Sequence, residues 1–134
     1  LTKINNFLQK HHRLSLATSG GDELSVCSLF YVFDKESHSF VVASSLETRH
    51  IADILEQPLV AGSVALETRI VGKIEGVQFK GRVRAIEEER LKILYLKKFP
   101  YAAVMNPKLW SIEVSFFKLT DNKLGFGTKI IWHS

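Results

Sequence analysis

Cysteine is nearly absent from this sequence of 134 residues, which holds only Cys27. A single thiol cannot form an intramolecular disulfide or a thiolate zinc site, so a domain held together by either is excluded. With 46% hydrophobic residues, the chain is long enough to bury its own core. We therefore expect one folded domain over residues 1–134, in a reducing compartment, by default the cytoplasm.

Long apolar runs and blocks of one charge are also missing. No stretch approaches the roughly 18 apolar residues of a membrane span, and the first residues lack the pattern of a secretion signal. The 18 Lys and Arg residues are interspersed with 14 acids, giving a net charge of +4 without a long basic block. We expect neither a membrane nor a nucleic acid as partner.

The common catalytic motifs are absent as well. There is no P-loop, nucleophile elbow or dinucleotide glycine fingerprint, and Gly125-Phe126-Gly127 is better explained as a bulge or tight bend. The five histidines show no metal-ligand spacing, so no metal site is expected. Trp110, Phe126 and Trp132 are more typical of a core than of cofactor stacking.

What the chain does contain is a series of short strands with few helices. Periodicity and turn residues predict helices over 2–12, 48–57 and 87–98, and strands over 14–18, 24–33, 40–43, 59–66, 74–86, 110–116 and 126–132. Strands in mostly antiparallel order do not suit a doubly wound sheet. We predict an α+β, mainly β fold: a six-stranded antiparallel β-barrel with a few flanking helices.

One strand is apolar on both faces. Residues Leu29 to Phe33 place Leu29, Tyr31 and Phe33 on one side and Phe30 and Val32 on the other. Such a strand needs cover on its outer face from a helix, a ligand or a partner. This pattern motivates the expectation of a homodimer.

The segment from Ser44 to His50 has the chemistry of an anion site. A strand runs directly into a helix start that carries Ser44, Ser45, Thr48, Arg49 and His50. Free backbone N–H groups at a helix start favour a phosphate, and a guanidinium can bind two of its oxygens. The alternative is an ordinary capped helix with solvated Arg and His side chains.

Gln78 is a second candidate. It lies between Val77 and Phe79 on the face of a strand opposite the apolar one, where its amide could bind a heterocycle. The alternative is a solvent-facing polar residue in an alternating strand. Lys80, Arg82 and Arg84 share its face and are interpreted as solvated.

The order of elements resembles the pyridoxamine phosphate oxidase-like FMN-binding split barrels over nearly the whole chain. The matching segments are Phe40 to Ser45, then Thr48-Arg49-His50, the turn Gln57-Pro58, and Gly76-Val77-Gln78-Phe79-Lys80-Gly81. The last segment and Thr120 to Gly127 are similar to the YhbP-like bacterial branch, for which no reaction follows from the resemblance.

The resemblance implies a homodimeric FMN-binding split-barrel domain that acts on a small-molecule substrate, with an oxidoreductase as the activity to be expected. It places the phosphate at Arg49 and His50, with Ser44, Ser45 and Thr48 as donors, and Gln78 beside the ribityl chain or ring. Ser28, Leu29, Phe30 and Tyr31 would line the isoalloxazine, and Trp132 would cover it from the second subunit.

Two departures from the family pattern matter. His50 stands where the family has Lys, and a neutral imidazole is a weaker phosphate partner than an ammonium. The set of Arg and His residues that binds pyridoxamine phosphate is missing near the C-terminus, where only Lys129 and His133 are found. Pyridoxamine phosphate oxidation is therefore not predicted.

Two other functions stay open. Some members of the superfamily hold haem, for which His133 or His50 would be the iron ligand. Alternatively, the chain holds FMN without turning it over, as a non-catalytic flavin-binding module.

Overall fold

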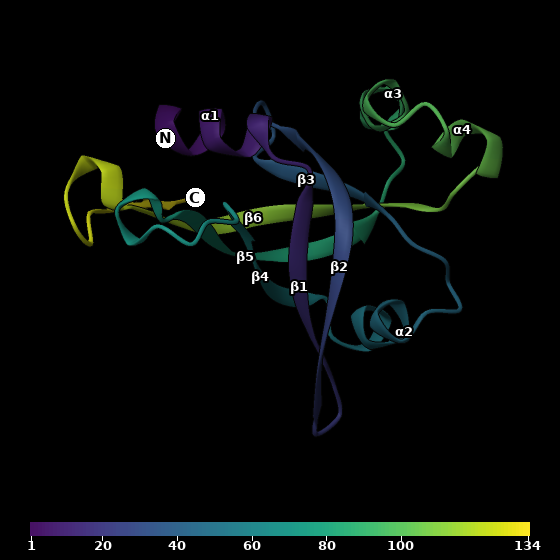
Figure 1. Ribbon diagram of the computed structural model, residues 1–134. Helices are drawn as coiled ribbons and strands as arrows, with labels where there is room; N and C mark the ends of the chain where they lie inside the picture. The colour runs from purple at the N-terminus through teal and green to yellow at the C-terminus, as the bar shows by residue number, and fades with distance from the viewer.

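A computed structural model describes all residues, 1–134, and its sheet forms most of the molecule (Figure 1). The strands are β1 (Arg13–Gly20), β2 (Glu23–Asp34), β3 (Ser39–Ala43), β4 (Leu59–Ala65), β5 (Glu75–Ala85), β6 (Leu109–Asp121) and β7 (Lys129–His133). The helices are α1 (Thr2–Lys10), α2 (Arg49–Glu56), α3 (Glu89–Lys98) and α4 (Ala102–Met105), with single turns η1 (Val71–Lys73) and η2 (Asn122–Leu124). None of these helices has the length and apolar character needed to cross a membrane.

Six of the strands close into a barrel. Every pairing is antiparallel and the order is β3-β2-β1-β4-β5-β6, with β6 returning to β3. Along one edge of β6, the first half pairs with β3 from Leu109 to Glu113, and the second half pairs with β7 from Phe116 to Thr120. The predicted six-stranded antiparallel split barrel is confirmed, with β7 as an added strand.

The core lies inside the barrel because alternate residues of each strand point inward. Phe40 of β3 is fully buried there, with the Phe79 ring 4.6 Å and the Phe117 ring 6.2 Å from it, centre to centre. Helices α1 and α2 contribute apolar side chains to the same cluster, namely Ile4, Phe7, Leu8, Ile51 and Ile54. The amphipathic spacing of both helices was visible in the sequence.

Helix α3 covers part of the outer surface of β2. Val32 and Val41 pack there with Leu91, Tyr95 and Leu109 in a second, smaller cluster. The apolar outer face expected for β2 is therefore covered by the chain itself at Val32. Closer to the β1–β2 turn, the same face of β2 is open: Leu24, Val26 and Phe30 are 82%, 74% and 55% exposed.

The C-terminal strand begins later than predicted. Gly125 and Gly127 adopt positive φ values of 137° and 73°, and the Gly127 N–H donates to the Asn122 side chain at 2.9 Å. This turn holds Phe126 out of the sheet, and its side chain is 84% exposed. The expectation of a buried Phe126 was wrong because two glycines bend the chain before the strand can start.

Candidate functional site

Ser44, Thr48 and His50 meet where β3 ends and α2 begins. The Ser44 hydroxyl lies 2.5 Å from His50 Nε2 and 3.2 Å from the Thr48 hydroxyl. Trp110 Nε1 donates to the Ser44 carbonyl at 3.1 Å, and the Thr48 hydroxyl donates to the Ser45 carbonyl at 2.9 Å. Three predicted site residues therefore form one hydrogen-bonded cluster, with Ser45 beside it.

The backbone at the start of α2 leaves donors free. The N–H groups of Arg49, His50 and Ile51 bond to no backbone carbonyl, as is usual in the first turn of a helix. Burial lowers the pKa of His50, with the negative charge of Asp53 opposing the shift. This shift favours the uncharged form of the imidazole that contacts the Ser44 hydroxyl.

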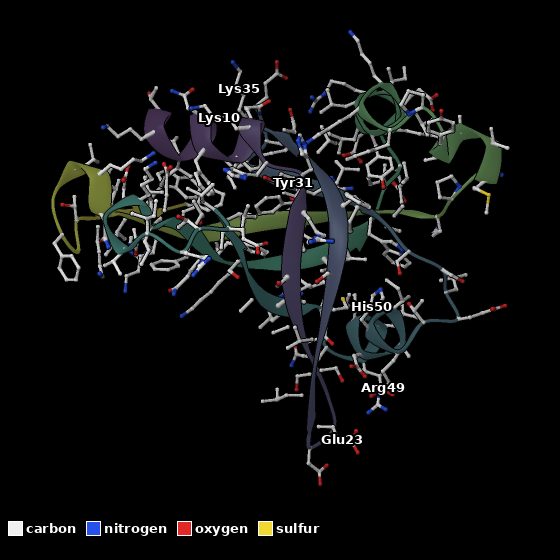
Figure 2. The ribbon with its side chains drawn as sticks, in the orientation of Figure 1. Lys10, Glu23, Tyr31, Lys35, Arg49 and His50 are labelled. Atoms are coloured by element: carbon white, nitrogen blue, oxygen red, sulfur yellow. The ribbon has the colours of Figure 1, made fainter.

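Arg49 points away from this cluster. Its side chain projects toward Glu23, near the tip of the β1–β2 hairpin, and forms an ion pair with it (Figure 2). Arg49 Nε also lies 3.5 Å from the Asp53 carboxylate. The hydrogen bond that Arg49 donates to Glu23, together with the negative charges of Glu23 and Asp53, raises the pKa of Arg49. The pair with Glu23 is accessible to solvent, since its side chains are 61% and 70% exposed, whereas Asp53 is buried.

A cavity of about 530 Å³ opens beside the cluster. One wall is the β3–α2 connection, including Ser44, Ser45 and Glu47, and the other is the connection from α4 to β6. The second wall contributes Met105, Asn106, Pro107 and Lys108. Arg49 and His50 do not line this cavity.

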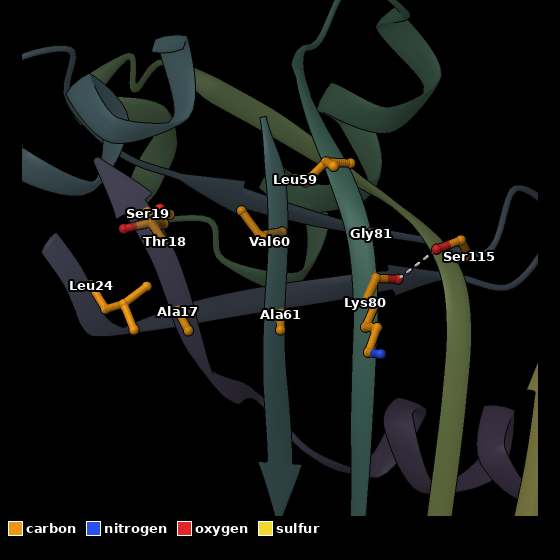
Figure 3. A pocket seen from close by; sticks show the side chains of 10 residues that line it. All are labelled: Ala17, Thr18, Ser19, Leu24, Leu59, Val60, Ala61, Lys80, Gly81 and Ser115. Atoms are coloured by element: carbon orange, nitrogen blue, oxygen red, sulfur yellow. Dashed lines mark hydrogen bonds between the residues drawn. The ribbon is translucent and has the colours of Figure 1, made fainter. Parts of the chain in front are cut away.

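A second hollow, of about 440 Å³, lies on the outer face of the barrel over β1, β4 and β5 (Figure 3). Its lining includes Ala17, Leu24, Leu59, Ala61 and Lys80, and Ser115 donates to the Lys80 carbonyl at 3.3 Å. Gln78 lines an adjoining hollow of about 320 Å³ on the same face. The small side chains of β1 and β4 make this face shallow and open.

The remaining predicted site residues divide between the two sides of the barrel wall. Ser28 and Phe30 are exposed on the outer face of β2, while Leu29 is half-buried against the core. Tyr31 is fully buried, and its hydroxyl donates to the Leu8 carbonyl at 2.7 Å inside the barrel (Figure 2). Within one chain, no hydrogen bond or shared cavity joins Gln78 to the Ser44 cluster.

Trp132 is held by its own chain. Its ring centre lies 4.6 Å from that of His38 and 5.5 Å from that of Phe117, and the side chain packs against the main core. His133, one residue later, is exposed on the other face of β7, with its ring centre 5.2 Å from that of Phe116.

Comparison with known proteins gives the family. The model of the pyridoxamine 5'-phosphate oxidase family matches residues 1–120. The chain belongs to this family. A UPF0306 protein of Cronobacter sakazakii is 38% identical over 135 residues, covering 98% of this chain and 94% of the relative. A UPF0306 protein of Photorhabdus laumondii is 36% identical over 132 residues, covering 96% and 92%. The resemblance drawn from the sequence is confirmed, including the YhbP-like branch.

Solved structures show the same fold at low sequence identity. HutZ, the heme storage protein from Vibrio cholerae, superposes with a TM-score of 0.71 at 16% identity, covering 85% of this chain and 89% of its own. An FAD-binding protein from Mesorhizobium loti gives 0.71 at 14% identity, covering 88% and 91%. The same fold therefore occurs in a protein named for heme storage and in one named for FAD binding.

Sequence reasoning missed several groups around the site of this family member. Asp53 was detectable, since it stands four residues after Arg49 on the same helix face. Glu23 and the residues Met105 to Lys108 gave no such signal. They reach the site only through the folding of the β1–β2 hairpin and of the connection before β6.

No group of three or more His, Cys, Asp or Glu side chains that could hold a metal ion is found among residues 1–134.

Proposed function

We propose that this chain is an FMN-binding flavoprotein that works as a homodimer, with the flavin transferring electrons to or from a small-molecule substrate. The observation that carries this proposal is the cluster of Ser44, Thr48 and His50 at the free N-terminus of α2, beside a cavity lined by Ser44 and Ser45. Hydroxyl and backbone N–H donors at a helix start are the groups that bind a phosphate monoester. Family membership and a flavin-binding structural neighbour support the same cofactor class.

The donor set fits the phosphate end of FMN better than it fits a metal or a neutral ligand. Ser44, Ser45 and Thr48 supply hydroxyls, and the first turn of α2 supplies backbone N–H groups that bond to no carbonyl. Arg49 would turn from Glu23 toward the phosphate, which exchanges one exposed ion pair for a charge-assisted bond. Its long side chain, 61% exposed, has room to make that change.

The flavin ring would require a second copy of the chain. Gln78 lies on the outer barrel face, apart from the phosphate cluster, so a single chain does not bring both ends of the proposed site together. The outer face of β2 and β4 exposes Leu24, Val26, Phe30 and Leu59, each more than half exposed. Monomeric proteins rarely leave such a patch open, and a two-fold contact in a homodimer would cover it.

The redox chemistry in this proposal belongs to the isoalloxazine, which accepts and donates hydride or single electrons. The protein would hold the phosphate through the α2 cluster and present Gln78 and the outer face of β2 to the ring. Hydride or electron transfer by the flavin requires no general acid or base from the protein. An oxidoreductase and a non-catalytic flavin module share this site, and the rate of flavin reoxidation distinguishes them.

Haem is a second candidate cofactor, because His133 is exposed on β7 and makes no hydrogen bond through its side chain. Structural neighbours named for heme, including HutZ, share the fold. In that case His133 would hold the iron, and Lys80, whose ammonium lies 5.4 Å from the centre of the Phe116 ring, would supply positive charge for a propionate. His50 fits an iron ligand less well because its Nε2 already bonds to Ser44.

The deciding experiment is a visible absorption spectrum of the purified protein before and after addition of FMN, with unbound cofactor removed. A retained flavin spectrum is the expected result. A Soret band that disappears in His133→Ala but persists in His50→Ala would replace FMN with haem. A colourless protein that cannot be loaded with FMN would contradict the proposed function while leaving the fold unaffected.

A further inference from the structure

One basic residue lines the cavity beside Ser44, and it is not one of those expected from the sequence. Its lining residues are Ala43, Ser44, Ser45, Leu46, Glu47, Met105, Asn106, Pro107 and Lys108. Lys108 is the only base among them. Arg49 and His50, which the family resemblance places at the phosphate, both lie outside the lining.

The two expected bases also have other partners. Arg49 is paired with Glu23 and lies 3.5 Å from Asp53, on the hairpin side of α2. His50 is half-buried and bonded to Ser44, and burial lowers its pKa, which disfavours the charged imidazolium. The cavity therefore receives no positive charge from α2, the helix that follows its first wall.

Lys108 is held beside the cluster by the backbone. The Ser44 N–H donates to the Lys108 carbonyl at 3.0 Å, which ties the last residue before β6 to the first residue after β3. The Lys108 ammonium lies 5.6 Å from the centre of the Trp110 ring, and Trp110 Nε1 in turn donates to the Ser44 carbonyl. Lys108 makes no ion pair in the structure, so its ammonium is available to an anion.

We propose that Lys108 is a second cation, besides Arg49, that binds the phosphate monoester of the cofactor at this cavity, in the place of the ammonium that His50 does not supply. The inference rests on the proposed function and adds to it a residue from a different part of the chain. Ser44, Ser45 and the Asn106 amide complete the donor set. Glu47, at the edge of the same cavity, opposes the anion and limits its affinity.

FMN and riboflavin differ only by the phosphate, so the pair isolates this contact. Lys108→Ala should weaken FMN binding about ten- to a hundredfold, the loss typical of a charge-assisted bond, and leave riboflavin binding unchanged. Lys108→Arg should stay within a few-fold of the unmodified protein, and Glu47→Gln should tighten FMN but not riboflavin. Lys97→Ala, which removes an equal charge from an exposed position on α3, serves as control.

The outcomes separate this inference from the proposed function. If the unmodified protein binds FMN and Lys108→Ala binds it equally well, the role of Lys108 is overturned and the flavoprotein proposal stands. If the unmodified protein binds no flavin, the flavoprotein proposal fails, and inorganic phosphate followed by ³¹P NMR line broadening becomes the probe. Phosphate binding that Lys108→Ala abolishes then sustains the cavity as an anion site, and phosphate binding that is absent or unaffected overturns it.

Discussion

The carboxylate of Asp53 on α2 accepts a hydrogen bond from the Thr18 hydroxyl of β1 at 3.0 Å, and both side chains are buried. The Asp53 carboxylate also lies against the backbone of Gly20, where an added Cβ would be only 2.1 Å from Asp53 Oδ1. Asp53 also lies 3.5 Å from Arg49. This carboxylate therefore ties the helix that starts the proposed phosphate site to the barrel wall.

Thr18→Val should destabilise the fold by about 1–3 kcal/mol, because it leaves a buried carboxylate oxygen without its donor. The free energy of unfolding, measured with urea, is the appropriate readout. Thr120→Val on β6 is a matched control, since that half-buried hydroxyl makes no side-chain hydrogen bond. A Thr18 variant as stable as the Thr120 variant would show that Asp53 obtains a donor elsewhere.

Arg49→Ala should weaken FMN binding roughly ten- to a hundredfold, if the guanidinium turns to the phosphate. Riboflavin binding should not change. The measurement is a titration of flavin fluorescence, with Arg69→Ala on the β4–β5 connection as the control for lost charge. Unchanged FMN affinity would remove Arg49 from the site.

Glu23→Gln should have the opposite effect. Glu23 competes with the phosphate for Arg49 in the proposed mechanism, and the pair is solvent-exposed, so its loss should tighten FMN by about 0.2–1 kcal/mol. The same titration measures this change, with Asp22→Asn at the neighbouring turn position as control. Weaker FMN binding in Glu23→Gln would mean that Glu23 orients Arg49 for the ligand instead of competing for it.

The barrel was predictable because its signals are local. Alternation in β5 and β6, the turn residues after Thr18, and the helix ending before Pro58 each depend on neighbours in sequence. The start of β7 was not predictable, because the two glycines that delay it, Gly125 and Gly127, are also compatible with a simple bulge within a longer strand. The hydroxyl cluster of the candidate site was likewise local, since Ser44, Thr48 and His50 lie within seven residues.

The partners of those residues were not predictable because they come from distant segments. Glu23 reaches Arg49 across 26 positions, and Trp110 reaches Ser44 across 66. Likewise, the second face of the Leu29–Phe33 strand was recognised as needing cover, but no sequence pattern showed that α3 covers Val32 while Leu24 and Val26 stay exposed.

Val26→Asp should prevent dimer formation if a second copy covers the outer face of β2. Val26 is 74% exposed in the single chain, so the variant should fold, whereas a carboxylate buried in an apolar interface is strongly unfavourable. Light scattering after gel filtration gives the mass. Ile93→Asp, on the exposed side of α3, should leave the dimer intact. A dimeric Val26→Asp protein would place the interface elsewhere.

The stability of the fold should fall in acid in a window set by Asp34 at the end of β2. Arg90 of α3 donates to both of its oxygens, at 3.0 and 2.8 Å, and this hydrogen bonding lowers the pKa of Asp34 from the ordinary 3.8 to about 2. Because the unfolded chain takes up a proton first, the stabilisation is complete above about pH 4 and is lost as the pH falls toward 2.

Asp34→Asn isolates that effect. Urea unfolding at pH 7, 4 and 2 should show the variant less stable than the unmodified protein by about 1–2 kcal/mol at the two higher pH values, a range that allows for solvent screening of the half-exposed Arg90. The difference should shrink at pH 2, where Asp34 of the unmodified protein is largely protonated. Glu36→Gln is the control: Glu36 lies 3.5 Å from the same guanidinium but is 75% exposed, so it should change stability little at any pH. A difference for Asp34→Asn that stays constant from pH 7 to 2 would mean that the carboxyl contributes through packing and hydrogen bonding alone, and not through its charge.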